Sequence, residues 1–357
     1  MPNQLALDAA HRAQGAAIRE LDGWLLPASY GDPTAEYAAL RDAAGVIDRS
    51  PLGKVIVTGR DRQSFLQGML SNDVKSLEPG QGTAAAFLDA HGKVMALLTV
   101  YALEDRLLLE LPPSLTEKTL QALDKFLISE KAAFEAADEA FAVLAVQGPG
   151  ARSLLEKLAG RTLDLAPYYH VEAPIAGAPV RVINRAEGHV AGFHCWTAAA
   201  HGAALWRALV AEGARPVGME ALNVLRMEAG MPWYGHDVDE TVILPETRLE
   251  QLVSYTKGCY IGQEVVARVK YRGHVNRALS GLIVDGDRVP APGAAVMADG
   301  KEIGRITSAV RSLALGRPIA LSYLRREHFA PGSAVGVQDG GALLPARVAE
   351  LPFVRPA

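Results

Sequence analysis

A strand, a glycine turn and a helix follow one another twice in this chain, at a constant spacing. The first copy passes from the apolar run 55–58 through Gly59 into a predicted helix, and the second passes from 143–147 through Gly148 into another. The two glycines are 89 residues apart (148 minus 59). The same offset joins a pair of serines and a pair of leucines, namely Ser64 with Ser153 and Leu66 with Leu155. Repetition at a fixed spacing predicts two related α+β lobes.

A nucleotide-binding βαβ fold is the alternative for such a pattern. That fold needs a glycine fingerprint such as G-x-G-x-x-G, or a P-loop, to hold phosphates at the start of the helix. Neither glycine turn carries such a fingerprint. The repeat therefore favours paired α+β lobes over a nucleotide site.

The region from 278 onward changes to short strands with turn signals at close spacing. Asp299-Gly300 is typical of a type I′ hairpin, and the run 339–341 (Asp-Gly-Gly) marks a second hairpin. Short strands at such spacing predict a small β-barrel. We therefore expect a two-lobed domain over 1–277 and a barrel domain over 278–357.

Charge and cysteine content exclude several classes of function. A formal net charge of −4 provides no basic field for nucleic acid. Cys195 and Cys259 are the only cysteines, and their spacing predicts neither a disulfide framework nor a metal centre. The Ala-rich run 5–21 predicts a helix without the apolar core of a secretory signal. Free thiols and the absence of a long apolar run predict a cytoplasmic protein that binds neither membranes nor nucleic acid.

The stretch Lys257–Arg268 combines a cysteine, a lysine, two glycines and a Gln-Glu pair. Apolar residues at i, i+4 and i+8 predict a helix that starts near Tyr260 or Ile261. Cys259 would then lie at a helix N-terminus beside Lys257, where the helix dipole and the cation favour the thiolate. The alternative is a small buried hydrophobe, the usual state of a free cysteine. The first interpretation makes Cys259 and Lys257 candidate catalytic residues.

The segment Lys257–Glu264 (KGCYIGQE) resembles the signature of the YgfZ family. Members of that family are tetrahydrofolate-binding proteins that support the assembly or repair of iron–sulfur proteins. They are related to the glycine-cleavage T-protein, an aminomethyltransferase. The resemblance also covers residues 59–73, 225–237 and 265–273. It implies an α+β fold with two interleaved lobes around a folate pocket, a C-terminal β-barrel, and tetrahydrofolate as the cofactor.

The same resemblance implies a working thiol at Cys259 and a folate site drawn from several segments. The residues implied for folate binding are Arg226, Glu228, Asn72, Asp73, Tyr260, Gln263 and Glu264. The planar guanidinium of Arg226 suits the carboxylates of a folate tail, and the carboxylate of Glu228 suits a pterin ring. An ion pair on a helix surface is the alternative for these two residues. Capping of helix ends is the alternative for the remaining polar pairs.

One departure separates this chain from the T-protein. The T-protein carries an Asp pair after Gly-Gly, and one of the two is its catalytic acid or base. Met95 and Ala96 occupy the matching positions here, and neither can move a proton. The T-protein also lacks the cysteine that this chain has at Cys259.

We therefore expect a folate-binding accessory protein for iron–sulfur proteins, not a conventional enzyme. Its expected partners are folate and iron–sulfur client or assembly proteins, which it would bind transiently. The alternative function is a tetrahydrofolate-dependent aminomethyltransferase, or another one-carbon transferase.

Overall fold

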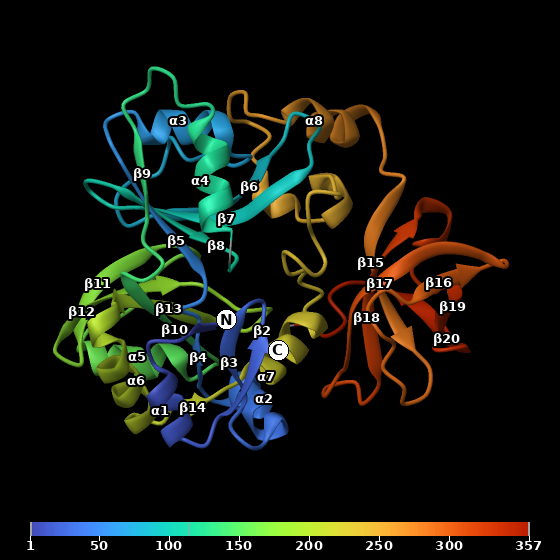
Figure 1. The fold of residues 1–357 in the computed structure, drawn as a ribbon, viewed down its shortest axis with the longest axis horizontal. Helices are drawn as coiled ribbons and strands as arrows, with labels where there is room; N and C mark the ends of the chain where they lie inside the picture. The colour runs from blue at the N-terminus through green and yellow to red at the C-terminus, as the bar shows by residue number, and fades with distance from the viewer. Residues whose placement is uncertain (1, 114, 356–357) are drawn as a thin grey trace. The chain divides into compact units, whose positions relative to one another are not determined.

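The protein is described by a computed structural model over residues 2–113 and 115–355. Its contacts divide the chain into two compact units (Figure 1). Unit 1 comprises residues 1–85 and 96–222, and unit 2 comprises residues 86–95 and 223–357. No helix in the described part of the chain is both long and apolar enough to cross a membrane.

Two sheets form most of unit 1. The order of the five-stranded sheet is β6-β7-β8-β5-β9, and that of the six-stranded sheet is β11-β12-β13-β10-β4-β14. The strands of the first sheet are β5 (Gly53–Thr58), β6 (Gly82–Leu88), β7 (Val94–Ala102), β8 (Leu107–Leu111) and β9 (Ala133–Ala136). Those of the second are β4 (Gly45–Asp48), β10 (Phe141–Gln147), β11 (His170–Ile175), β12 (Ala178–Asn184), β13 (Gly192–Ala198) and β14 (Arg215–Pro216).

An exchanged strand interleaves the two lobes. Strand β4 precedes β5 in the chain but pairs with β10 in the other sheet, whereas β9 precedes β10 but pairs with β5. The predicted fold of interleaved α+β lobes is therefore confirmed. Between the two sheets lies a core of apolar and aromatic side chains, which includes Leu52, Tyr101, Leu108, Val143, Ile183 and Trp196.

The glycine turns of the repeat have the same structural cause in both lobes. Gly59 and Gly148 have left-handed φ values of 95° and 121°. A Cβ atom at Gly59 would lie 2.1 Å from the carbonyl oxygen of Lys131, and one at Gly148 would lie 2.3 Å from that of Ala43. Lys131 and Ala43 lie just before the exchanged strands. Glycine is required at both turns because the exchanged segment passes directly over the backbone.

The first turn of each repeated helix is tied down by equivalent hydrogen bonds. Ser64 Oγ donates to the carbonyl oxygen of Asp61 (2.9 Å), and Ser153 Oγ donates to that of Gly150 (3.1 Å). The two acceptors, like the two serines, are 89 residues apart (150 minus 61). The repeat found in the sequence thus extends to individual contacts.

Helices cover the outer faces of these sheets. Helix α4 packs on β5 and β9, while α5 and α6 pack on strands of the six-stranded sheet (Figure 1). The helices that begin in unit 1 are α1 (Asp8–Ala13), α2 (Pro33–Asp42), α3 (Arg62–Met69), α4 (Thr116–Asp124), α5 (Ala151–Ala159), α6 (Gly202–Ala211) and α7 (Met219–Glu228), with the 3-10 turn η1 (Ala199–His201).

The predicted helix over 5–21 is wrong. Helix α1 ends at Ala13, and the chain continues into the hairpin of β2 (Ala17–Leu21) and β3 (Trp24–Ser29). Asp22 and Gly23 form its turn with φ values of 51° and 78°. An Asp-Gly pair with two positive φ values is the type I′ hairpin signal. The hairpin forms a three-stranded sheet with β1 (Asn3–Gln4), in the order β1-β3-β2.

Unit 2 contains a closed β-barrel, as the spacing of turns in the sequence predicts. The order of its strands is β15-β18-β17-β16-β19-β20. They are β15 (Arg277–Val284), β16 (Ala295–Ala298), β17 (Lys301–Arg311), β18 (Pro318–Arg325), β19 (Ala334–Asp339) and β20 (Ala342–Ala349), with the 3-10 turn η4 (Arg326–His328). Asp299 and Gly300 have φ values of 50° and 71°, as a type I′ turn requires.

The tip of the β6–β7 hairpin belongs to unit 2. Val94 N donates to Val242 O (3.0 Å), and Leu244 N donates to Gly92 O (3.0 Å), so the connection after α7 pairs with this tip. That connection contains two 3-10 turns, η2 (Leu244–Thr247) and η3 (Glu250–Leu252), and leads to helix α8 (Gln263–Arg272). This connection is thus an ordered loop.

Candidate functional site

The cysteine segment enters α8 later than predicted. The helix begins at Gln263, after Gly262 has taken the left-handed conformation with φ 81°. A start near Tyr260 or Ile261 is therefore wrong. Cys259 is exposed and lies four residues before the first helical residue. The helix dipole acts within the first turn, so it does not account for a reactive thiol at this position.

Gly262 and Gly92 let the start of α8 pack closely on the tip of the β6–β7 hairpin. A Cβ atom at Gly262 would lie 2.5 Å from Asp89 O, and one at Gly92 would lie 2.9 Å from the Cβ atom of Val265. Both glycines have positive φ. The sequence Gly-Gln-Glu therefore marks a close backbone approach, which only glycine permits.

We expect Gly262→Ala to lower the melting temperature (Tm) by roughly 5 °C. Left-handed backbone in a non-glycine residue costs about 1–3 kcal/mol, and the clash with Asp89 adds to that cost. Gly258→Ala is the matched control, since nothing lies within 4 Å of a Cβ atom there and its φ is not positive. Thermal unfolding followed by circular dichroism measures both variants. Equal Tm values would contradict the packing described.

The other residues of the segment separate into buried and exposed positions. Tyr260 is buried, the ammonium of Lys257 lies 4.9 Å from its ring centroid, and burial raises the pKa of Tyr260 to about 12. Glu264 is exposed and forms an ion pair with Arg268 (2.6 Å) on the surface of α8. Gln263, the first residue of the helix, donates its backbone N–H to Tyr260 O (3.3 Å). A role of these residues in folate binding stays a prediction.

Arg226 is buried at the end of α7 and is the centre of a polar network in unit 2. Its guanidinium lies 4.6 Å from the centroid of a Trp233 ring. It makes four hydrogen bonds, to Asn223 Oδ1 (2.8 Å), Met231 O (3.2 Å), Asp237 Oδ2 (2.5 Å) and Ser308 Oγ (2.9 Å). Burial lowers the pKa of Arg226. These contacts join α7, the following loop and the barrel, while its role in folate binding stays a prediction.

Glu228 is also buried and ties α7 to the barrel. Its Oε1 accepts hydrogen bonds from Ser312 Oγ (2.6 Å) and from the backbone N–H of Ala314 (3.0 Å). Its carbonyl oxygen accepts from Val354 N (3.0 Å). The alternative of a surface ion pair between Arg226 and Glu228 is wrong, because both side chains are buried. The predicted pterin contact of Glu228 stays a prediction.

Asn72 and Asp73 follow helix α3 in unit 1. Asn72 Nδ2 donates to Ala84 O (2.8 Å), and Asn72 Oδ1 accepts from Asp73 N (3.0 Å). Burial raises the pKa of Asp73, but hydrogen bonds from Ser76 and Gln67 outweigh this effect and lower it below its ordinary value. The two side chains therefore organise the turn after α3, and folate contact stays a prediction for them as well.

Unit 1 contains a buried charge cluster that the sequence-based predictions do not include. His194 Nδ1 lies 3.0 Å from Glu110 Oε2, and His194 Nε2 lies 3.2 Å from Glu187 Oε1. Arg185 Nε and Arg49 Nε lie 2.8 and 2.9 Å from these two glutamates respectively. Burial lowers the pKa of His194, but the two carboxylates outweigh this effect and raise it. The signal was a single glutamate in the otherwise apolar strand β8 (LLLEL).

This cluster predicts a specific dependence of stability on pH. The raised pKa of His194 stabilises the fold below the ordinary value of 6.5, and this contribution is lost as pH rises through the pKa of the folded state. The lowered pKa values of Glu110 and Glu187 stabilise the fold above 4.5, and that contribution is lost as pH falls. The cluster is thus most stabilising between these two values.

We expect the wild type to lose stability above about pH 6.5 and His194→Gln to abolish that loss. Calorimetric Tm values from pH 5 to 9 measure this dependence. The exposed His201, changed to Gln, is the control and is expected to follow the wild type. Parallel pH profiles for wild type and His194→Gln would contradict the charge assignment.

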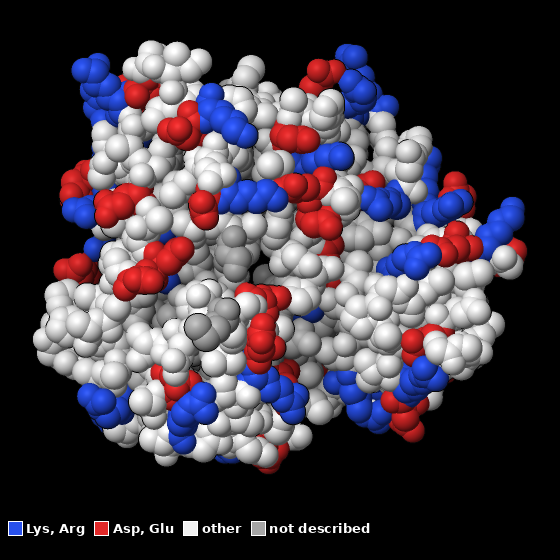
Figure 2. Space-filling view, viewed as in Figure 1, with Lys and Arg blue, Asp and Glu red and all other residues white. Residues whose placement is uncertain are grey.

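Charge on the surface is mixed. Figure 2 shows Lys and Arg interspersed with Asp and Glu on the face in view. Among residues 2–113 and 115–355, no group of three or more His, Cys, Asp or Glu side chains could hold a metal ion.

The fold consists of two interleaved α+β lobes followed by a closed six-stranded barrel. Comparisons with known protein families identify the class of protein that has this fold. Residues 7–257 match the model described as the GCVT N-terminal domain. Residues 277–355 match the glycine cleavage T-protein C-terminal barrel domain. The chain belongs to this glycine cleavage T-protein (GCVT) family.

Individual relatives resemble the chain over its full length. A protein named aminomethyltransferase from Streptomyces avermitilis is 34% identical over 364 residues, covering 99% of this chain and 98% of the relative. One with the same name from Streptomyces coelicolor is 33% identical over 98% of this chain and 97% of its own length. The crystal structure of glycine cleavage system aminomethyltransferase T from Bartonella henselae has the same fold, with a TM-score of 0.91 at 23% identity, covering 100% of this chain and 99% of that one.

The expected function as an accessory protein for iron–sulfur proteins is wrong. It rested on the Lys257–Glu264 signature and a few further segments, whereas the similarity to proteins named aminomethyltransferase covers 364 aligned residues. The expectation that the chain is not a conventional enzyme has no support in these comparisons. The same is true of iron–sulfur clients as partners. The alternative function, a tetrahydrofolate-dependent aminomethyltransferase, agrees better with these relatives.

Proposed function

We propose that the protein is a tetrahydrofolate-dependent aminomethyltransferase, which passes a one-carbon unit to the folate. The observation that carries this proposal is the full-length similarity, at 34% identity, to a protein named aminomethyltransferase. The family match over both the lobes and the barrel supports it, because a folate enzyme of this class would need both parts. Function here is inferred from relatives and not from the fold alone.

This chain has no titratable side chain at the positions where the resemblance implies an acid for proton transfer. When the methylene carbon of a carrier-bound aminomethyl group passes to the nitrogens of folate, its bonds to the carrier sulfur and to the amine break, and the protons lost by the folate nitrogens go to the leaving thiol and ammonia. A positioned titratable group speeds such proton transfers. Strand β7 carries Met95 and Ala96 at the positions where the resemblance to the T-protein implies an Asp pair. We therefore propose a transferase whose chemical step is slower than that of a relative with the acid.

Tyr234 is the polar side chain that the structure places against this part of β7. Its hydroxyl donates to Met95 O (2.8 Å) and lies 3.3 Å from Val94 O. Burial raises the pKa of Tyr234, so the phenol keeps its proton at neutral pH. In the proposed enzyme, Tyr234 fixes the backbone of β7 by donating a hydrogen bond and does not act as a base.

Two finer expectations belong with this proposal. Membership of the YgfZ branch stays a prediction, and it depends on the cysteine segment Lys257–Glu264. A cytoplasmic location also stays a prediction, which follows from the two free thiols Cys195 and Cys259. We likewise propose that the chain divides at residue 278.

Calorimetric titration with tetrahydrofolate tests the binding part of the proposal. We expect one folate to bind per chain and to raise Tm, because a ligand that binds only the folded state stabilises it. The control ligand is p-aminobenzoylglutamate, which has the tail without the pterin and is expected to bind at least tenfold more weakly. Absence of heat and of a Tm shift at millimolar tetrahydrofolate would overturn the proposal.

A further inference from the structure

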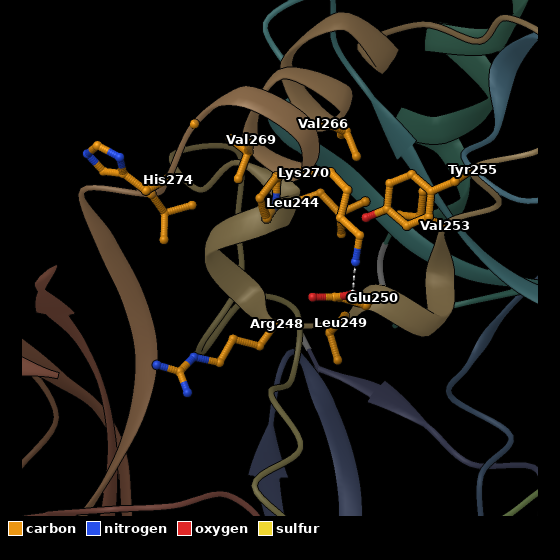
Figure 3. A pocket seen from close by; sticks show the side chains of 13 residues that line it. Leu244, Arg248, Leu249, Glu250, Val253, Tyr255, Val266, Val269, Lys270 and His274 are labelled. Carbon is orange, nitrogen blue, oxygen red and sulfur yellow. Dashed lines mark hydrogen bonds and ion pairs between the residues drawn. The ribbon is translucent and has the colours of Figure 1, made fainter. Parts of the chain in front are cut away.

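A cavity of about 340 Å³ lies within unit 2, between helix α8 and the segment that contains η2 and η3 (Figure 3). Lys270 Nζ lies 2.8 Å from Glu250 Oε2 in an ion pair, and Figure 3 shows Arg248 reaching away from that pair. The charges inside this cavity are therefore compensated. Unit 1, in contrast, has two charges without an ion-pair partner in the described part of the chain, on an edge of its five-stranded sheet.

That edge is strand β9, which pairs with β5 on one side and ends the sheet of the described residues on the other. Successive residues of an antiparallel strand direct their backbone groups to opposite sides. The odd-numbered residues face β5 and its following turn, since Ala137 N donates to Lys54 O (2.8 Å). Lys131 O likewise accepts from Asp61 N (3.1 Å). The residues that direct N–H and C=O outward are therefore Ala132, Phe134 and Ala136.

Two exposed side chains of opposite charge flank the centre of this edge. They are Lys131 and Glu135, and neither makes a hydrogen bond or an ion pair within the described part of the chain. The guanidinium of Arg106, on which Glu135 acts electrostatically, forms its ion pair with Asp105 instead (2.6 Å). Because Lys131 and Glu135 are four residues apart in an extended segment, both side chains lie on the same face of the strand.

Apolar side chains are exposed in the turn that leads into β9. Ile128 is 90% exposed and Phe126 is 44% exposed. In Figure 1 this connection from α4 to β9 projects from its lobe. An edge strand with outward backbone groups is a template for a further strand, and a chain paired with it would also meet these side chains.

We propose that the outer edge of β9 pairs antiparallel with β9 of a second copy of this chain, across a two-fold axis. Pairing Ala132 of each copy with Phe134 of the other uses the outward backbone groups. This register also places Lys131 of each copy opposite Glu135 of the other, so that two ion pairs form. A shift that pairs Phe134 with Ala136 would place the two Glu135 carboxylates opposite each other, which is unfavourable. The inference concerns association and goes beyond one-carbon transfer.

Sedimentation velocity of the full chain at increasing concentration tests this pairing. We expect a weak dimer, half formed at about 10–100 µM, because one short strand makes an interface below the standard size. Lys131→Glu and Glu135→Lys are each expected to weaken the dimer at least tenfold, since each variant turns both ion pairs into like-charge contacts. An equimolar mixture of the two variants is expected to regain nearly the wild-type affinity, because both ion pairs form again between unlike chains.

Two further variants separate the edge from a general effect of charge. Ala132→Pro removes an outward N–H without removing a bond to β5, and is expected to weaken the dimer at least tenfold. Lys301→Glu reverses an exposed charge in the barrel and is the matched control, with the affinity of the wild type. Circular dichroism of each variant establishes that it is folded.

Several results would overturn the proposal. These are a wild type that stays monomeric at millimolar concentration, single charge reversals that leave the dimer unchanged, and a mixture of the two variants that associates no more tightly than either alone. Unchanged association of Ala132→Pro would exclude pairing through the backbone of this edge. A loss in Lys301→Glu equal to that in Lys131→Glu would place the effect in net charge and not in β9.

Discussion

Replacing Arg226 with alanine is expected to lower the free energy of unfolding by about 3–5 kcal/mol, the cost of removing one partner from a buried ion pair. Arg226 donates to Asp237 at 2.5 Å, and both side chains are buried. The variant would leave the Asp237 carboxylate away from water, with only the Trp233 N–H and the Thr307 hydroxyl as donors. Ser308 of the barrel would lose its hydrogen-bond donor in α7 at the same time.

Urea unfolding of Arg226→Ala measures this loss, with Arg268→Ala as the matched control. Arg268 is an exposed arginine in the i,i+4 pair with Glu264, and such pairs contribute about 0.3–0.5 kcal/mol. Arg226→Lys is informative as well, because one ammonium cannot replace four donors in a fixed fork. A change below about 1 kcal/mol for Arg226→Ala would refute the network, since surface substitutions fall in that range.

Restoring an acid pair in β7 is expected to raise aminomethyl transfer by about a hundredfold, the lower end of what a general acid or base contributes. The double variant Met95→Asp, Ala96→Asp supplies the two carboxyl groups that the resemblance to the T-protein implies for this segment. Ala96 is fully buried and Met95 is half-buried, so the new groups would be partly desolvated. Desolvation raises the pKa of a carboxyl group towards the range useful for catalysis near neutral pH.

The double variant Met95→Asn, Ala96→Asn is the control for this experiment. Asparagine has the shape of aspartate but cannot exchange a proton in this pH range, so we expect no gain from it. Steady-state rates across pH, together with Tm values, separate a catalytic effect from a loss of folded protein. Equal rates for the Asp, Asn and wild-type chains would show that the missing acid does not limit the reaction.

Those parts of the fold that local turn chemistry determines could be predicted from the sequence. Gly59 and Gly148 indicated the repeat because only glycine, which has no Cβ atom, leaves room for the exchanged segment at both turns. Asp299-Gly300 indicated a barrel hairpin because a type I′ turn requires two residues with positive φ. The helix expected over 5–21 is wrong because Asp22-Gly23, an equally clear hairpin signal, turns residues 17–29 into a pair of strands.

The site was less predictable because its properties come from distant contacts. The start of α8 depends on Gly262, which lies directly against the carbonyl oxygen of Asp89, some 170 residues earlier in the chain. Arg226 resembled a surface or ligand-binding arginine, yet Asp237 and Ser308 bury it. The Glu110–His194 contact joins two strands of different lobes, a pairing that no local pattern reveals.

A single-turnover assay tests the central claim most directly. The purified chain is mixed with tetrahydrofolate and a carrier that holds a lipoyl-bound aminomethyl group, and one-carbon-substituted tetrahydrofolate is measured over time. The proposed function predicts its formation above the rate without protein, with dependence on tetrahydrofolate and a further increase in the Met95→Asp, Ala96→Asp chain. Formation no faster than without protein in both the wild-type and the acid-restored chains, despite bound folate, would contradict the assignment as an aminomethyltransferase.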